Sequence, residues 1–178
     1  MSKTDKPMKN VSFKFMSSFF ALRDKIKDPM IKVRKANIIS GNHVLDYGCG
    51  PGTFSIEAAK VVGDSGKVYA LDIQPLSGDK IKKRAVEEGL NNIETITTNC
   101  STGLEDNSID VVMCFDMFHM SKGQQNILEE IHRVLKPNSI FSFDCHHMKE
   151  ENIKSIIVGS NLFKLIEKID KTYNFKKI

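Results

Sequence analysis

The sequence predicts an α/β domain built on a doubly wound sheet of seven strands, mostly parallel, with one antiparallel strand near the C-terminus. The first observation behind this class is the regular alternation of short β-type runs with helical patterns, which is typical of parallel strands joined by crossover helices. The second is the two-residue gap between the last two β-type runs, 163–169 and 172–175, because so short a connection joins antiparallel neighbours.

The chain ahead of the sheet is expected to form a tail and lid helices over residues 1–37, followed by a core over residues 38–178 in the same domain. Apolar side chains recur at spacings of three and four over 13–27, as on one face of a helix that ends before Pro29. A second short helix is expected over 30–37, and the first nine residues are expected to be disordered. The phenylalanines of the first helix could enclose an apolar or aromatic substrate, pack as ordinary core, or contact a lipid surface.

From residue 41 onward, the expected elements follow one another as strand and helix. The expected strands cover residues 43–46, 67–71, 93–97, 111–115 and 140–143, together with the two runs of the C-terminal hairpin. The expected helices cover residues 53–62, 76–88, 124–135 and 150–158, with stop signals at Gly89, Pro137 and Gly159. Ligands bind a doubly wound sheet where its strand order reverses, so the cleft is expected at the carboxyl ends of the first and fourth strands.

Length and composition favour one compact domain over two. The 178 residues are 40% hydrophobic and 27% charged, with a net charge of +4, and contain no tract of 18 apolar residues. The opening residues lack a signal-peptide pattern. The four cysteines, Cys49, Cys100, Cys114 and Cys145, are widely spaced, which argues against a disulfide framework or a zinc knuckle and favours a reducing, cytoplasmic location.

The charge is unevenly distributed along the chain. Residues 1–36 carry ten Lys and Arg against three Asp and Glu, whereas residues 37–163 carry eleven against seventeen. This is not the continuous basic face of a nucleic-acid-binding domain, so nucleic acid is disfavoured as a partner. A basic arm could attract an anionic substrate or a membrane surface, or could simply be a solvated end of the chain.

A glycine-rich turn, VLDYGCGPG, follows the first expected strand. Gly48, Gly50 and Gly52 remove every second Cβ, which lets a ligand approach the backbone closely. The spacing G-x-G-x-G departs from the dinucleotide fingerprint, whose third glycine would fall at Thr53, so nicotinamide and flavin cofactors are disfavoured. Asp72 ends the second strand, where a carboxylate can accept hydrogen bonds from two vicinal ribose hydroxyls.

Several stretches together resemble the class I S-adenosylmethionine-dependent methyltransferases, in particular the small quinone-biosynthesis-like members. VLDYGCGPG is similar to the first motif of that family, VYALD to its second, LEDNSIDVVMC to its fourth-strand signature, and EEIHRVLKP to the helix and turn that follow. The resemblance implies a Rossmann-like fold, S-adenosylmethionine as cofactor and S-adenosylhomocysteine as product. The usual Gly-Gly after Lys-Pro is replaced by Asn138-Ser139, in a turn remote from the expected chemistry.

The resemblance also implies roles for individual residues. The glycine turn would line the methionyl part of the cofactor, Asp46 would add compensating negative charge, and Asp72 would hold the ribose. An Asp of the family that accepts from the adenine amino group is replaced here by Asn99, which keeps the acceptor oxygen and loses the charge. The implied cofactor-binding residues are Asp46, Tyr47, Gly48, Gly50, Gly52, Asp72, Ile73, Gln74, Asn99, Cys100 and Asp116.

Candidate acid–base residues follow the fourth and fifth strands. Methyl transfer depends mainly on positioning and exclusion of water, and only some acceptors need a base. The catalytic candidates are His119, His146 and Asp116, although Asp116 is better suited to contact the cofactor ammonium; the alternative is loop histidines that pack or face water. A metal site from Asp144, His146, His147 and His119 is chemically reasonable, but its spacing matches no known zinc pattern, so no metal is predicted.

Two other chemistries are disfavoured by missing dipeptide or tetrapeptide motifs. Cys145 stands where a covalent nucleophile could act, but the Pro-Cys pair of pyrimidine carbon methyltransferases is absent. The Asn-Pro-Pro-Tyr type motif of nucleic-acid amino methylation is also missing after the fourth strand.

The predicted function is transfer of a methyl group from S-adenosylmethionine to a small acceptor, with apolar and aromatic acceptors among the candidates. One alternative is a non-catalytic scaffold or regulatory partner that binds S-adenosylmethionine or S-adenosylhomocysteine, and a more remote one is a nicotinamide-dependent oxidoreductase. The small-molecule substrate is the expected partner. A weak peripheral contact with a membrane, and a monomeric or homodimeric state, both stay open.

Overall fold

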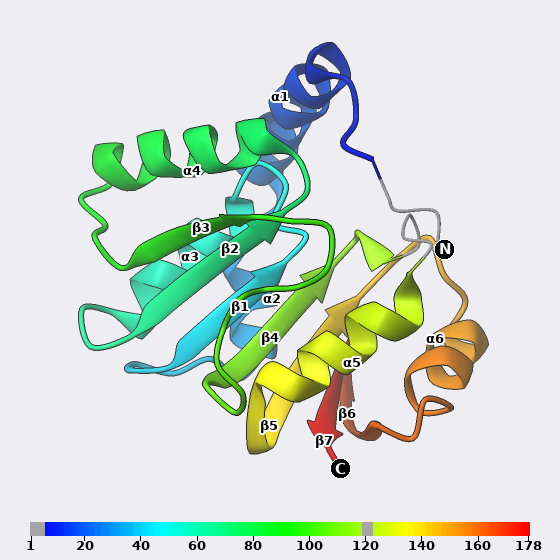
Figure 1. Ribbon diagram of the computed structural model, residues 1–178. Coiled ribbons are helices and arrows are strands. Elements are labelled where there is room, and N and C mark those ends of the chain that lie inside the picture. The colour runs from blue at the N-terminus through cyan, green and yellow to red at the C-terminus, as the bar shows by residue number, and fades with distance from the viewer. Residues whose placement is uncertain (1–5, 119–122) are drawn as a thin grey trace.

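The computed structural model describes residues 6–118 and 123–178 and shows one sheet covered by helices on both faces (Figure 1). The strands are β1 (His43–Tyr47), β2 (Lys67–Asp72), β3 (Ile93–Thr97), β4 (Ile109–Phe115), β5 (Leu135–Asp144), β6 (Phe163–Ile169) and β7 (Thr172–Lys177). The helices are α1 (Asn10–Ile26), α2 (Met30–Lys35), α3 (Thr53–Val62), α4 (Pro75–Glu87), α5 (Gln124–Val134) and α6 (Glu150–Ile157).

The order of the strands is β3-β2-β1-β4-β5-β7-β6. Strands β1 to β5 pair in parallel, and β7 runs antiparallel to both β5 and β6, so the predicted class with one antiparallel strand is confirmed. The order reverses between β1 and β4, which places the switch point where the sequence predicts it.

Alternating side chains of the central strands build two apolar layers. Val44 and Val111 pack with α2 and α3 on one face, whereas Leu45 and Val112 pack with α5 and α6 on the other. Both faces of these strands are buried, as is typical of a parallel sheet between helices. The layered core holds the loops at the carboxyl ends of β1, β2, β4 and β5 in fixed positions.

The junction between α5 and β5 differs from the expectation. The helix was expected to run through Leu135 into a turn, with a strand over 140–143, but α5 ends at Val134 and β5 begins at the next residue. Leu135 is already extended, with ψ 134°, and Pro137 disfavours helix at Lys136. Asn138 takes a positive φ of 66°, and the pairing of β4 with β5 shifts register between Ile109 and Val111. The replaced Gly-Gly position thus lies inside an irregular strand.

The N-terminal helix α1 lies above the carboxyl ends of the strands, at the top of Figure 1. Two polar contacts fix it there: the Thr53 hydroxyl donates to Asp24 Oδ2 at 2.6 Å, and Gln74 Nε2 donates to the Met8 carbonyl at 2.7 Å. Residues 1–5 of the expected disordered tail lie outside the described residues. Among the described helices, none combines the length and apolar character needed to cross a bilayer.

Candidate functional site

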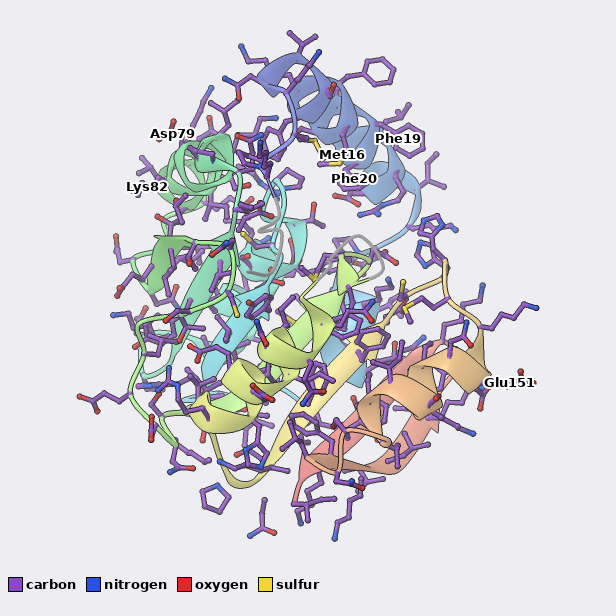
Figure 2. All side chains as sticks on the ribbon, turned by 45° about the vertical axis from the view of Figure 1, so that its right-hand side comes forward. Met16, Phe19, Phe20, Asp79, Lys82 and Glu151 are labelled. Atoms are coloured by element: carbon purple, nitrogen blue, oxygen red, sulfur yellow. The ribbon has the colours of Figure 1, made fainter. Side chains whose placement is uncertain are left out.

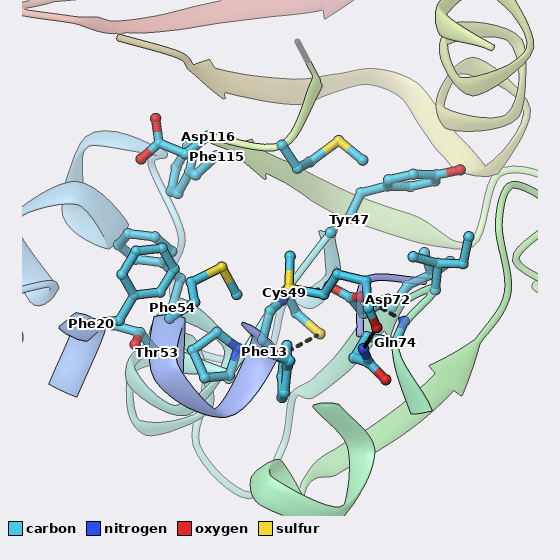
Figure 3. A pocket seen from close by; sticks show the side chains of 18 of the residues that line it. Phe13, Phe20, Tyr47, Cys49, Thr53, Phe54, Asp72, Gln74, Phe115 and Asp116 are labelled. Carbon is cyan, nitrogen blue, oxygen red and sulfur yellow. Dashed lines mark hydrogen bonds between the residues drawn. The ribbon is translucent and has the colours of Figure 1, made fainter. Parts of the chain in front are cut away.

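A cavity of about 310 Å³ opens at the switch point, between α1 and the ends of β1, β2 and β4. Figure 3 shows Asp72 and Gln74 on one side of this cavity and Phe20, Phe54 and Asp116 on the other. The volume lies at the lower end of the range of small-molecule pockets. Asp72 and Gln74 therefore form one polar end of the cavity, and Asp116 lies across from them beside aromatic side chains.

The glycine turn adopts a backbone that other residues rarely adopt. Gly48, Gly50 and Gly52 have φ values of 82°, 54° and 85°. A Cβ on Gly48 would lie 2.3 Å from Met117 Cγ, and one on Gly52 would lie 2.2 Å from Ile81 Cγ1. At Gly50 a Cβ would meet nothing within 4 Å, so this glycine opens onto the cavity that it lines. Two of the glycines thus serve packing, and the third leaves room for a ligand.

Asp72 connects the glycine turn to the loop after β2. Its Oδ2 accepts a hydrogen bond from the Gly50 N–H, and its Oδ1 accepts one from the Gln74 N–H, both at 2.8 Å. Burial raises the pKa of this carboxyl, and the two backbone donors oppose that shift. Each carboxylate oxygen keeps a second lone pair. Asp72 therefore organises the turn and can still accept hydrogen bonds from a ligand in the cavity.

Asp46 is buried under the glycine turn at the end of β1. Its Oδ2 accepts a hydrogen bond from the Ser55 hydroxyl at 2.6 Å. Burial raises the pKa of the carboxyl from 3.8 to about 7, with the Ser55 hydrogen bond acting against the rise. Asp46 thus approaches the turn from below rather than lining the cavity.

This raised pKa makes a prediction about stability. Between pH 3.8 and about 7 the unfolded carboxyl is ionised while the folded one keeps its proton, so the contribution of Asp46 to stability falls as the pH rises. We expect the free energy of unfolding of Asp46→Asn, relative to the wild type, to increase over that range and then to level off. Urea titrations across the range measure the difference, and a pH-independent difference would contradict the assignment.

Other implied cofactor-binding residues are spread around the polar end of the cavity. Ile73, Gln74 and Asn99 line it, whereas Cys100 packs against the core and accepts a 2.9 Å hydrogen bond from the Tyr47 hydroxyl through its carbonyl. The Gln74 side-chain oxygen is buried without a hydrogen-bond partner among the described residues. It is therefore a ready acceptor for a ligand.

A charged cluster adjoins the cavity at the ends of β4 and β5. His146 Nδ1 lies 3.1 Å from Asp116 Oδ1 and 3.5 Å from Asp144 Oδ1. Lys32 Nζ, from α2, lies 3.4 Å from Asp116 Oδ2 and 3.2 Å from Asp144 Oδ1. The structure thus brings two predicted catalytic residues together and adds a lysine that the sequence analysis missed.

Lys32 also bears on the metal site considered above. One ligand atom each from Asp116, Asp144 and His146 lie within 4.8 Å of one another, a set that could hold a cation. The Lys32 ammonium contacts both carboxylates of this set and supplies positive charge there. His147 contacts the His146 ring at 5.3 Å between centroids, and His119 lies outside the described residues.

The thiols do not have the features of nucleophiles. Cys49, Cys114 and Cys145 are buried, and burial raises the pKa values of Cys49 and Cys114. A reactive cysteine needs a lowered pKa and access to solvent, so these thiols are better described as packing residues that take no part in the chemistry.

The fold and the glycine turn define a class of proteins that bind a ribose-bearing cofactor at the switch point of a doubly wound sheet. Residues 38–175 match the family model described as a methyltransferase domain. The chain therefore belongs to the methyltransferase domain family, and its cofactor is S-adenosylmethionine, as the resemblance predicted.

Individual relatives fit this assignment. The chain is 32% identical over 130 residues to a demethylmenaquinone methyltransferase of Geobacillus stearothermophilus, covering 70% of this chain and 54% of that protein. It is 40% identical over 76 residues to the aklanonic acid methyltransferase DauC of a Streptomyces species, covering 42% and 34%. The chain thus spans about half the length, or less, of these curated relatives.

A solved structure shares the fold over nearly the whole chain. It is a SAM-dependent methyltransferase from Aquifex aeolicus, with a TM-score of 0.84 and 21% sequence identity, covering 96% of this chain and all of that one. A [4+2]-cyclase, SpnF, has the same fold with a TM-score of 0.68, 17% identity and coverages of 81% and 59%. The fold is therefore shared by proteins with different names and reactions.

Proposed function

We propose that this protein transfers the methyl group of S-adenosylmethionine to a small acceptor with an apolar or aromatic body. The observation that carries the proposal is the composition of one continuous cavity, which joins the Gly50 turn and Asp72 to a chamber lined by Phe20, Phe54 and Phe115. The polar end suits the cofactor and the aromatic part suits the acceptor.

The polar end fits the cofactor in three respects. The open side of Gly50 leaves space that a Cβ would fill, Asp72 has free lone pairs for the ribose hydroxyls, and the Gln74 side-chain oxygen lacks a partner among the described residues. Asn99 would accept from the adenine amino group, and Asp116, which lines the cavity, would compensate the ammonium charge. When bound, S-adenosylmethionine supplies an electrophilic methyl group on a sulfonium.

The chain supplies positioning, exclusion of water and a proton acceptor. Phe13, Met16 and Phe20 of α1 close the cavity from above, which keeps bulk water from the acceptor. His146 Nδ1 lies within 3.5 Å of one oxygen of each of two carboxylates, so the tautomer with its hydrogen on Nδ1 would direct that hydrogen toward them and leave Nε2 to take a proton from the acceptor. Asp116 is then a positioning residue for His146, balanced by Lys32.

We infer the kind of acceptor from the residues that line the chamber and from the names of the relatives. The names of the relatives indicate different acceptors, demethylmenaquinone and aklanonic acid, so homology alone does not select one. The aromatic and methionine lining favours an apolar acceptor over a highly charged one, and a screen of quinols, phenols and other small aromatic compounds is the appropriate search.

The Gly50→Ala substitution tests the cofactor site. The added Cβ meets no protein atom within 4 Å, so it should enter the space assigned to the cofactor and weaken S-adenosylhomocysteine binding about tenfold or more. Titration calorimetry with S-adenosylmethionine and S-adenosylhomocysteine measures the affinity, and formation of S-adenosylhomocysteine in the acceptor screen measures transfer.

Gly89→Ala is the matched control. Gly89 also has a positive φ, 67°, with nothing within 4 Å of its added Cβ, but it ends α4 away from the cavity. Both variants should lose a similar free energy of unfolding, about 1–2 kcal/mol, because both force alanine into a left-handed backbone. Equal affinity in the two variants would remove Gly50 from the cofactor site, and tight binding without transfer to any acceptor would favour the scaffold alternative.

A further inference from the structure

Helix α1 is apolar on two sides. Its inner side chains Phe13, Met16 and Phe20 line the cavity, and Phe13 is only 1% exposed. Figure 2 shows Met16 and Phe20 on the side of the helix toward the cavity and Phe19 on its outer side. Five large apolar side chains on the outer side are between 60% and 81% exposed, and they are called the outer stripe here: Val11, Phe15, Phe19, Leu22 and Ile26.

The outer stripe forms a continuous band. Its members are separated by four, four, three and four residues, so they follow one face of the helix over its whole length. The side chains of the outer stripe are not needed for packing within this chain, since Phe13 and Ser17 are the buried residues on the opposite face of α1. Exposed apolar bands of this kind mark interaction sites.

The surroundings of the outer stripe are basic. Lys9, Lys14 and Lys27 are exposed at or next to α1, and Asp28 is the exposed acidic residue that follows them. Lys80 of the neighbouring α4 has its pKa lowered by burial and by the nearby charge of Lys14, and its ammonium lies 5.9 Å from the centre of the Phe13 ring. Positive charges therefore gather at the end of the molecule that carries the outer stripe.

We propose that the outer stripe binds the surface of an anionic lipid bilayer, with α1 lying in the plane of the interface. A helix with exposed Phe, Leu and Ile and adjacent lysines gains from burying apolar area at the headgroup boundary and from attraction to anionic lipids. One such helix provides only weak, reversible binding. The interaction is therefore salt-sensitive and peripheral.

A second copy of this chain fits the stripe less well. The seventeen residues of α1 are about 26 Å long, so a dimer held by the outer stripe alone would depend on the contact of a single helix face. Pairing two such stripes would also bring two strongly basic N-terminal segments together, which costs free energy. An anionic lipid surface would instead attract the positive charge of these segments.

Docking at this surface would place the cavity next to lipid. The inner side of α1 closes the cavity, so a bilayer on its outer side lies one helix away from the acceptor chamber. An apolar acceptor dissolved in lipid could then enter around α1. This consequence rests on the proposed function, whereas the lipid contact itself does not and is tested without catalysis.

The Phe19→Trp variant reports the contact directly, because the natural chain contains no Trp. The emission of Phe19→Trp should shift to shorter wavelength with vesicles of phosphatidylcholine and phosphatidylglycerol in equal parts, and the shift should vanish in pure phosphatidylcholine or at about 1 M salt. Ile178→Trp, at an exposed position near the opposite end of the molecule, should not shift.

Sedimentation with the same vesicles measures the affinity. Phe15→Glu should bind the mixed vesicles about tenfold more weakly than the wild type, since it removes an aromatic ring that would be buried at the lipid interface and adds repulsion from the anionic headgroups. Ile178→Glu makes the same apolar-to-acidic change elsewhere and should bind as the wild type does. The proposal would be overturned if the emission did not shift with anionic vesicles, or if the protein bound neutral vesicles equally well. It would also be overturned by a shift that grows with protein concentration in the absence of lipid, which would indicate that a second copy of the chain covers the stripe.

Discussion

His146→Ala should lower the turnover number for methyl transfer about 100-fold, while the affinity for S-adenosylhomocysteine should stay near that of the wild type. This result is expected because a positioned base contributes roughly 10²–10⁴-fold, and His146 is held by Asp116 and Asp144 at 3.1 and 3.5 Å. Steady-state kinetics with an acceptor from the screen measures turnover, and calorimetry measures the affinity.

The neighbouring His147 is the matched control for this variant. Both imidazoles are exposed and adjacent in the chain, but the two carboxylates contact His146. His147→Ala should keep most of the turnover. An unchanged turnover in His146→Ala, or a larger loss in His147→Ala, would contradict the role of His146 as the base.

Asp116→Asn should lower the turnover number less than His146→Ala does. The substitution keeps a hydrogen-bond acceptor near Nδ1 and removes one negative charge, so the imidazole keeps its place while the positive charge that it gains on accepting a proton is less stabilised. The turnover number should therefore fall while the KM for the acceptor stays near that of the wild type. A purely structural role for Asp116 would lower the thermal stability along with the turnover number.

Most of the fold could be predicted from local patterns. The strand at Ile93–Thr97, the helix at Thr53–Val62 and the strand at Phe163–Ile169 have the predicted bounds, because turn residues and changes of apolar period mark their ends. The predicted turn between α5 and β5 was wrong, because the Lys-Pro pair ends a helix without requiring a loop after it. A long strand that pairs Leu135 with Ile109 depends on contacts that no local window contains.

The candidate site was predictable where its residues follow strands. Asp72, Asp116 and Asp144 stand at the carboxyl ends of β2, β4 and β5, and the topology brings such ends together. Lys32 was missed because it contacts Asp116 across 84 positions of the chain, and its place in α2 carries no motif. The Ser55 contact with Asp46 was missed for a similar reason, since an ordinary helical serine gives no sign of which carboxylate it reaches.

The Asp72→Ala variant should weaken binding of S-adenosylhomocysteine about 100-fold or more. Two hydrogen bonds from ribose hydroxyls to a charged acceptor would be lost, each contributing roughly 1.5–3 kcal/mol, and the Gly50 and Gln74 N–H groups would lose their acceptor. The loss thus combines a missing ligand contact with a looser glycine turn. Calorimetry at fixed salt measures it.

Two further variants separate these contributions. Asp72→Asn keeps one acceptor oxygen and should fall between the wild type and Asp72→Ala, whereas Asp79→Ala removes a similar charge from the exposed surface of α4 and should bind as the wild type does (Figure 2). If Asp72→Ala keeps its thermal stability and loses affinity, the ribose contact dominates. If both stability and affinity fall in Asp72→Ala but not in Asp72→Asn, the carboxylate acts mainly by holding the Gly50 turn. Unchanged affinity in both variants would remove Asp72 from the cofactor site.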